Sequence, residues 1–253
     1  MYRVDKDEYE VILEQTSPGE APPATVAVSL YNYEGCISEC LLSAESQTLQ
    51  RLDLVVVDDH STDHSAEVAT VWLRAHLDRF DRALIARSRH NRGLAGTRNT
   101  AFALARTEYV FVLDADNTLY PRCLERLCAA LRNCSASFAY CYLEKFGDTT
   151  ALLNTKAWDP ANLRNGNSID AMVLHRRKFL DQVGGYSEDM PVMGWEDFDL
   201  WFKIARAGGW GVLVPEILAR YRVHRSSLLN VVTNPNTAKL WSYLRSRHPE
   251  FFT

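Results

Sequence analysis

Short apolar runs and amphipathic stretches alternate along the chain from residue 25 to about residue 135. The apolar runs are rich in β-branched and aromatic residues and are bounded by polar ones, which predicts buried strands. These strands cover residues 26–30, 52–57, 83–86 and 109–113. Between them, apolar side chains recur at i, i+3, i+4 and i+7, the spacing of a helix with one buried face. These helices cover residues 37–44, 61–76, 95–105 and 121–132.

This alternation predicts an α/β fold with a Rossmann-like, mostly parallel central sheet flanked by helices. The crossovers should be right-handed, and ligands should bind where the carboxyl ends of the strands meet. After residue 135 the alternation is looser. The expected strands there cover residues 138–142, 169–174 and 217–223, and the expected helices cover residues 176–183, 198–207 and 238–247.

Polar residues follow three of the predicted strands. They are Tyr31 with Asn32, Asp58 with Asp59, and Asp114 with Asp116. In a parallel sheet these strand ends lie on one edge, and an Asp-x-Asp pair can direct both carboxylates to one side. Two close carboxylates need a cation between them, and Mg²⁺ or Mn²⁺ takes oxygen ligands. A capped turn with two solvated aspartates is the alternative for this tripeptide.

Charge and composition narrow the class of partner. The chain has 253 residues, of which 47% are hydrophobic and 24% charged, so it can bury a sizeable globular core. Its net charge of −4 provides no basic field for nucleic acid. An acidic protein that binds phosphates needs local cations, which again favours a metal ion.

Six cysteines, none in a Cys-x-x-Cys pair, are expected to be small core residues rather than a disulfide framework, which fits the reducing cytoplasm. The N-terminus carries no apolar leader, and no apolar run is long enough to span a membrane. Any membrane association is therefore expected to be peripheral.

Seven segments resemble the family 2 glycosyltransferases, which have the GT-A fold. Four of them match the nucleotide-sugar half: residues 28–32 (VSLYN), 55–63 (VVVDDHSTD), 91–99 (NRGLAGTRN) and 113–117 (LDADN). Three match the acceptor half: residues 183–186 (VGGY), 194–197 (GWED) and 221–227 (YRVHRSS). The order and spacing of these motifs carry the resemblance, which spans residues 25–228.

The resemblance implies one GT-A domain over residues 25–230. Residues 25–120 would form its nucleotide-binding half and residues 121–230 its acceptor half. Residues 1–24, which include the run Ser-Pro-Gly-Glu-Ala-Pro-Pro, would form an N-terminal arm and proline-rich linker. Residues 231–253 would form a C-terminal helical tail.

On the donor side, the resemblance places Ser29, Tyr31 and Asp59 around the base and ribose, with Asp59 accepting from an imide N–H of uracil. A buried carboxylate only accepts hydrogen bonds, so it favours a base edge that donates. Arg98 lies in a predicted helix that begins at a glycine-containing turn, residues 93–96. Its guanidinium is expected to form a bidentate hydrogen bond with the diphosphate. A capping role for Asp59 and a surface ion pair for Arg98 are the alternatives.

Asp114 and Asp116 then become the metal pair for a nucleoside diphosphate. The resemblance makes Asp116 the direct ligand, places Asp114 nearer the ribose, and makes His224 a further ligand. A divalent Mn²⁺ or Mg²⁺ would stabilise the charge that develops on the leaving diphosphate. His224 could equally be a structural or phosphate-contacting group.

By the same resemblance, Asp197 is the general base that deprotonates the acceptor hydroxyl in an inverting transfer. Glu196 would help to hold the acceptor, and Trp195 would stack against its sugar. The alternatives are an acidic pair that caps a helix and a tryptophan that belongs to the core.

These expectations describe an inverting, divalent-metal-dependent, hexosyltransferase-type enzyme of polysaccharide biosynthesis. It would move a sugar from a nucleoside-diphosphate donor, most simply a UDP-sugar, to a hydroxyl of a saccharide or lipid-linked glycan. Two alternative functions give Asp114 another role. It would be the nucleophile of a haloacid-dehalogenase-like phosphatase, or the phosphorylated residue of a receiver-like signalling domain. The third alternative is a GT-A domain that binds a nucleotide-sugar without transferring the sugar.

Overall fold

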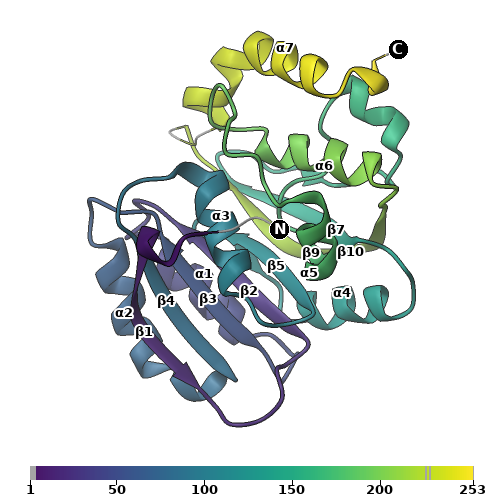
Figure 1. Cartoon of the computed structure of the whole chain (residues 1–253). Helices are drawn as coiled ribbons and strands as arrows, with labels where there is room; N and C mark the ends of the chain where they lie inside the picture. Colours follow the sequence, from purple (N-terminus) through teal and green to yellow (C-terminus); the bar gives the residue numbers. More distant parts are fainter. Residues whose placement is uncertain (1–3, 226, 228, 253) are drawn as a thin grey trace.

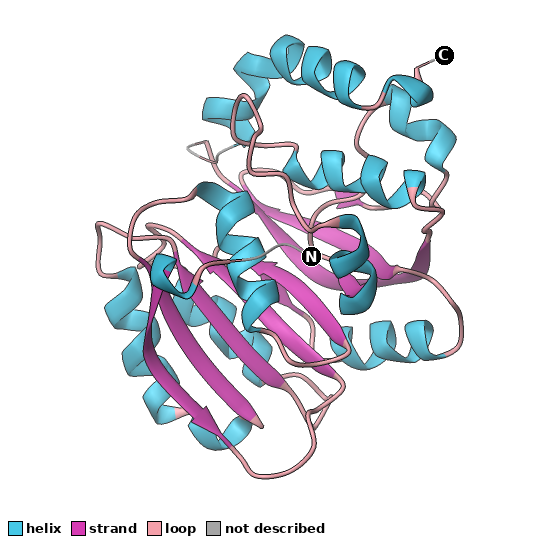
Figure 2. Cartoon of the chain, viewed as in Figure 1, coloured by secondary structure: helices cyan, strands magenta, loops and turns pink. Residues whose placement is uncertain are grey.

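One mixed sheet runs through the molecule in the order β1-β4-β3-β2-β5-β9-β7-β10-β6, with β8 paired to β7 (Figures 1 and 2). The computed structural model describes residues 4–225, 227 and 229–252. The strands are β1 (Tyr9–Thr16), β2 (Ala24–Leu30), β3 (Asp53–Asp58), β4 (Arg82–Ser88), β5 (Tyr109–Asp114), β6 (Thr118–Leu119), β7 (Phe138–Gly147), β8 (Leu152–Leu153), β9 (Leu174–Arg176) and β10 (Gly211–Val223).

Helices cover both faces of this sheet (Figure 2). They are α1 (Ile37–Glu45), α2 (Ser65–Ala75), α3 (Gly93–Leu104), α4 (Cys123–Arg132), α5 (Arg177–Val183), α6 (Glu196–Arg206) and α7 (Thr237–Arg247). The buried residues of α1, α2 and α4 join one apolar cluster, and those of α3, α5, α6 and α7 join a second cluster on the opposite face. The sheet is therefore the middle layer of three.

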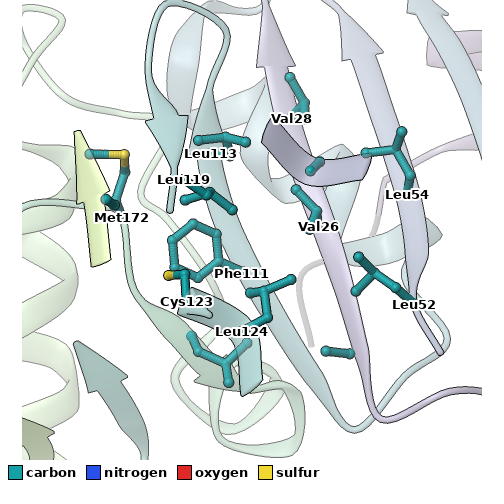
Figure 3. Close-up of a cluster of buried hydrophobic side chains, with 14 of the residues drawn as sticks. Val26, Val28, Leu52, Leu54, Phe111, Leu113, Leu119, Cys123, Leu124 and Met172 are labelled. Carbon is teal, nitrogen blue, oxygen red and sulfur yellow. The ribbon is translucent and has the colours of Figure 1, made fainter. Parts of the chain in front are cut away.

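Side-chain alternation along the strands assigns residues to these two clusters. Val26 and Val28 of β2 belong to the first cluster, whereas Ala27 between them belongs to the second. Figure 3 shows the first cluster, in which Phe111 of β5 lies close to Cys123 of α4. Four of the six cysteines are small core residues as predicted, Cys36 and Cys134 are only partly buried, and all six are free thiols.

The strands β4, β3, β2 and β5 are parallel neighbours, as the alternating pattern predicts. Their carboxyl ends consequently share one edge of the sheet. β9 runs antiparallel to both β5 and β7, while β10 is parallel to β7. The predicted α/β, mostly parallel central sheet flanked by helices is confirmed.

Several predicted element boundaries are wrong. The strand predicted at residues 169–174 is absent from the described residues except at its end, because β9 begins only at Leu174. The cause is local: the Asp170 carboxylate accepts the Met172 N–H at 2.9 Å, which bends the chain into a turn. The predicted helix at residues 121–132 also starts late, since α4 begins at Cys123 and Pro121 precedes it.

The predicted N-terminal arm contributes a strand to the sheet. β1 pairs antiparallel with β4, with Tyr9 opposite Ser88 and Thr16 opposite Arg82. Arg82 also pairs with Glu14 at 2.8 Å. This edge strand was not predicted, because its burial pattern mixes exposed and half-buried positions without strict alternation.

The C-terminal segment packs on α6 (Figure 1). The His248 ring bonds the buried Asp199 carboxylate at 2.8 Å and stacks on Phe202 with 4.8 Å between ring centroids. Phe251 meets the same phenylalanine edge-on. The tail therefore stabilises the helix whose first turn carries Glu196 and Asp197.

An unusual polar group lies in the second cluster. His175 on β9 is 1% exposed, and the rings of Phe102, Phe138 and Trp201 lie 5.9–6.1 Å from its ring. Within the described part of the chain, neither ring nitrogen has a hydrogen-bond partner. Burial, and then the nearby Arg98 charge, lower the pKa of His175 to about 3. The imidazole is therefore neutral in the folded protein.

This burial makes stability depend on pH. The unfolded chain binds a proton at His175 below about pH 6.5, whereas the folded chain does so only below about 3, so this group removes stability as the pH falls between those values. We expect His175→Leu to be at least as stable as the parent at pH 7 and to gain about 2 kcal/mol more over it at pH 5. Urea unfolding at both pH values measures this difference. The control is His64→Leu at an exposed position, for which the stability difference from the parent should be the same at both pH values. If the stability difference for His175→Leu were also the same at both pH values, His175 would not be the group whose burial makes stability depend on pH.

Candidate active site

A cavity of about 780 Å³ opens at the carboxyl ends of the parallel strands. Its lining comes from the ends of β2, β5 and β10, from the first turns of α3 and α6, and from the loop before β9. The ten residues predicted as site residues all line it: Ser29, Tyr31, Asp59, Arg98, Asp114, Asp116, Trp195, Glu196, Asp197 and His224. The fold thus gathers motifs that are far apart in the sequence into one space.

Arg98 lies at the centre of this cavity wall. The residue is 3% exposed; its Nη2 donates to both oxygens of Asp114 at 2.8 and 3.0 Å, and its Nη1 donates to Glu196 Oε1 at 3.0 Å. The guanidinium also lies over the Tyr186 ring, 5.2 Å from its centroid. Arg98 does form ion pairs, as in the alternative to the expected diphosphate contact, but they are buried and not on the surface, and the guanidinium already has two carboxylate partners.

Asp116 and His224 form a second pair, on the other side of Asp114. His224 Nε2 and Asp116 Oδ2 are 3.3 Å apart, and β10 brings the histidine there from more than 100 positions along the chain. Burial and then the neighbouring Asp114 raise the pKa of Asp116, while the histidine opposes this shift. Both side chains line the cavity.

Asp59 is almost fully buried behind the mouth of the cavity. Its two oxygens accept the N–H groups of Arg92 at 2.9 Å and Gly93 at 2.8 Å, at the start of α3. Burial raises the pKa of this carboxyl, and the two N–H groups lower it. Asp59 therefore binds N–H groups at the start of α3 and does not cap the helix that follows it in the sequence, α2. Each oxygen keeps a second lone pair for a ligand.

Ser29 and Tyr31 lie at the end of β2 beside Asp59. Ser29 Oγ is buried and has no hydrogen-bond partner among the described residues. Tyr31 is 43% exposed. A buried hydroxyl without a partner next to a cavity is the pattern of a group that a ligand completes.

Asp197 and Glu196 occupy the first turn of α6, and their environments differ. Glu196 is fixed, since its second oxygen accepts the Gly194 N–H at 3.0 Å. Asp197 accepts from Asn167 Nδ2 at 2.8 Å and from the Phe198 N–H at 2.8 Å. Burial, then Glu196 and Asp170, raise the pKa of Asp197 to about 7. Such a pKa suits a group that accepts a proton near neutral pH.

Trp195 precedes this turn in a strained conformation, with φ of 65°. Its ring contacts Phe198 and Trp241 edge-on, with centroids 5.6 and 5.2 Å apart. The ring is half-buried, so it both packs in the core and reaches the cavity wall.

Sequence reasoning missed one further acid in the cavity. Asp170 lines the space that Asp114, Asp116 and Asp197 also line. The available signal was an aspartate inside a predicted apolar strand, a position where burial of a charge needs an explanation.

A divalent ion such as Mg²⁺ or Mn²⁺ needs several ligand atoms around one point. Among the described residues, no group of three or more His, Cys, Asp or Glu is arranged to hold a metal ion. Asp116 and His224 nevertheless present one oxygen and one nitrogen to the same space, while Asp114 is engaged by Arg98. Two protein ligands of this kind fit an ion whose remaining ligands are water and substrate phosphates, as in many Mg²⁺ sites.

The family model described as "Glycosyl transferase family 2" matches residues 25–187. Among curated relatives, the succinoglycan biosynthesis protein ExoU of Rhizobium meliloti is 30% identical over 229 residues, covering 84% of this chain and 62% of its own length. The UDP-Glc:α-D-GlcNAc-diphosphoundecaprenol β-1,3-glucosyltransferase WfaP of Escherichia coli is 24% identical, covering 81% of this chain and 78% of its own length. The chain thus spans less than two thirds of ExoU.

Solved structures share the fold. S. aureus TarS 1–349 in complex with UDP-GlcNAc superposes with a TM-score of 0.70 at 17% identity, covering 83% of this chain and 61% of that one. The mannosyltransferase PcManGT from Pyrobaculum calidifontis, in complex with GDP-Man and Mn²⁺, gives a TM-score of 0.63 at 22% identity over 92% of this chain and 64% of that one. Together with the family match, these neighbours identify the predicted GT-A fold. In the described part of the chain, none of the helices has the length and apolar character needed to cross a membrane.

The buried ion pairs of Arg98 should be important for stability. We expect Arg98→Met to destabilise the fold by about 3–5 kcal/mol, because it leaves Asp114 and Glu196 next to each other without a counter-charge. Adding Glu196→Gln should recover part of that loss. Urea unfolding measures both effects, with Arg122→Met as control, because the Arg122–Glu125 pair is exposed and worth less than about 1 kcal/mol. A cost for Arg98→Met no larger than that of the control would show that the bridge is not stabilising.

Proposed function

This chain belongs to glycosyl transferase family 2, and from that membership we propose that it transfers a sugar from a UDP-linked donor to a hydroxyl of a saccharide or lipid-linked glycan. We further propose that the transfer inverts the anomeric centre and uses a divalent metal ion. The observation that carries the proposal is the single cavity lined by all ten predicted site residues.

The donor half of the cavity suits a nucleotide. Ser29 would gain the hydrogen-bond partner that it lacks, and Asp59 would use a remaining lone pair to accept from the imide N–H of uracil. A base without that donor would leave the carboxylate unpaired, which gives discrimination. Relatives named with UDP-Glc and solved neighbours bound to UDP-GlcNAc support a nucleotide-sugar donor.

Asp116 and His224 would hold the metal ion, Mn²⁺ or Mg²⁺. The bound ion would stabilise the charge that develops on the diphosphate as it leaves. The PcManGT neighbour, which contains Mn²⁺, supports this assignment. Asp114, whose oxygens accept from Arg98, would instead orient that arginine and face the ribose side.

Asp197 would act as the general base. Its ionised carboxylate would take the proton of the acceptor hydroxyl while that oxygen attacks the anomeric carbon and the nucleoside diphosphate departs towards Asp116 and His224. One base on the side opposite the leaving group corresponds to inversion. α6 carries Asp197, whereas the proposed metal-binding pair follows β5 and β10. The base and the residues that would bind the leaving diphosphate therefore belong to different elements.

Arg98 and Glu196 would have different roles from those that the sequence suggests. The guanidinium is shared between Asp114 and Glu196, so we assign it to holding the base helix against the donor side instead of gripping the diphosphate. Glu196 is held by Arg98 and the Gly194 N–H, so it would position the neighbouring Asp197. Trp195 would still offer part of its ring to the acceptor sugar.

The acceptor and location are proposed from the relatives. ExoU is named for succinoglycan biosynthesis and WfaP for a diphosphoundecaprenol acceptor, which supports a glycan acceptor at a membrane surface with peripheral association of the protein. The six free thiols support the reducing cytoplasm as its compartment.

The two alternative activities are not favoured. Both the phosphatase and the receiver reading need Asp114 to accept a phosphoryl group, yet Arg98 engages both oxygens of that carboxylate. The family match also runs through the strands and motifs that precede Asp114, which neither reading explains.

Nucleotide binding tests the first half of the proposal. We expect UDP with Mn²⁺ to raise the unfolding temperature, because a hundredfold excess of ligand over Kd stabilises a fold by about 2.7 kcal/mol. Asp116→Ala should lose the metal-dependent part of this shift, whereas Asp148→Ala, an exposed position outside the cavity, should retain it. A thermal-shift panel of UDP, GDP and TDP with and without Mn²⁺ is the measurement. No response to any nucleotide under any metal condition would contradict the proposal.

Turnover tests the second half. We expect Asp197→Asn to bind UDP as the parent does and to lose about 10²- to 10⁴-fold in transfer rate, because the amide cannot accept the proton. In the parent enzyme, kcat/KM should rise with pH up to about 7 and then level off, since burial, Glu196 and Asp170 hold the pKa of the base at about 7 and only its ionised form is active. The assay follows glucose transfer from UDP-glucose to α-GlcNAc-diphosphoundecaprenol and other lipid-linked glycans. Unchanged turnover in the variant would remove Asp197 from the mechanism.

A further inference from the structure

We propose that Asp170 accepts a hydrogen bond from a hydroxyl of the transferred sugar and thereby selects uncharged sugars over anionic ones. This inference rests on the proposed function and names the donor-sugar class for that same cavity. Four observations support it: the place of Asp170, its fixed orientation, its free oxygen and the charges around it.

The pairing of β9 with β5 brings Asp170 to the reacting centre. Beyond the ladder itself, the Val112 N–H donates to the Val173 carbonyl at 3.2 Å, so the preceding loop runs beside the end of β5. That end carries Asp114 and Asp116, and the first turn of α6 adds Asp197 to the lining of the same cavity. In an in-line transfer the sugar lies between the leaving diphosphate and the base. Asp170 therefore lines the space that the transferred sugar occupies.

The Asp170 side chain is fixed before any ligand arrives. Its Oδ1 accepts the Met172 N–H at 2.9 Å, and its own backbone N–H donates to Asn154 Oδ1 at 2.8 Å. Asn154 is itself 3% exposed and adopts φ of 58°, a conformation that an asparagine tolerates better than most residues. No described residue bonds Asp170 Oδ2, so the second oxygen is available for a ligand.

The charge of this carboxylate decides which ligand fits. Burial, and then Asp114, raise its pKa to about 6, while the Met172 N–H and Arg98 oppose the shift, so the ionised form predominates at pH 7. An ionised carboxylate only accepts hydrogen bonds, and an O–H donor gives it a strong, charge-assisted one. Arg98, the cation that opposes this shift, is already shared by Asp114 and Glu196. A sugar carboxylate beside Asp170 would therefore meet a like charge that Arg98 is not free to offset.

Asp170→Asn separates this role from a merely structural one. The amide keeps the shape and the Oδ1 acceptor that forms the turn with Met172, but it loses the charge. Titration calorimetry with UDP, UDP-glucose and UDP-glucuronic acid, each with Mn²⁺, measures the effect. We expect the parent to bind UDP-glucose at least about tenfold more tightly than UDP-glucuronic acid. In Asp170→Asn this ratio should fall at least about fivefold, while the affinity for UDP changes less than about twofold.

Two variants serve as controls. Asp159→Asn lies outside the cavity, and its carboxylate likewise accepts an N–H two residues on, so it should change none of the three affinities. Asp170→Glu keeps the charge on a longer side chain, so it should still reject UDP-glucuronic acid while binding UDP-glucose more weakly. An unchanged ratio in Asp170→Asn, or an equal loss for UDP and UDP-glucose, would overturn the assignment of Asp170 alone. A parent protein that binds none of the three would overturn the proposed function, and this inference with it.

Discussion

The cleft depends on one buried cation. Arg98 lies between a carboxylate at the end of β5 and another in the first turn of α6, and its guanidinium has hydrogen bonds to both. Without it, these acids and the nearby Asp197 would repel each other. The ion pairs therefore connect the end of β5 to the first turn of α6. They also occupy Glu196, so the adjacent Asp197 is the carboxylate of that turn that we propose as the base.

Much of the fold could be predicted because its physical causes are local. Strands such as β3 and β5 are continuous apolar runs buried on both faces, and such runs are visible in the sequence. The location of the cavity could be predicted because the carboxyl ends of parallel strands lie on one edge of a sheet. Asp59 and Asp116, which follow two such strands, could therefore be expected to face one space. The identity of the residues around the cavity rested mainly on resemblance to a known family.

What could not be predicted depends on contacts between distant segments. Arg98 has Glu196 as a partner only because α3 and α6 cover the same face of the sheet, and no sequence spacing encodes that meeting. The role of Asp170 was hidden because its turn interrupts what otherwise reads as a strand. β1 was missed for a related reason: an edge strand with half-exposed side chains has little periodicity, and its pairing with β4 is decided by tertiary contacts.

The position of β1 has a practical consequence for how the protein is divided. The family match begins at residue 25, but the sheet begins sixteen residues earlier, where Tyr9 pairs with Ser88. A chain that began at residue 25 would lack β1 and would leave the outer hydrogen-bonding groups of β4 open along a largely apolar strand. Such uncovered edges recruit strands from other molecules, so a chain shortened in this way would tend towards aggregation even though every residue that lines the cavity is still present.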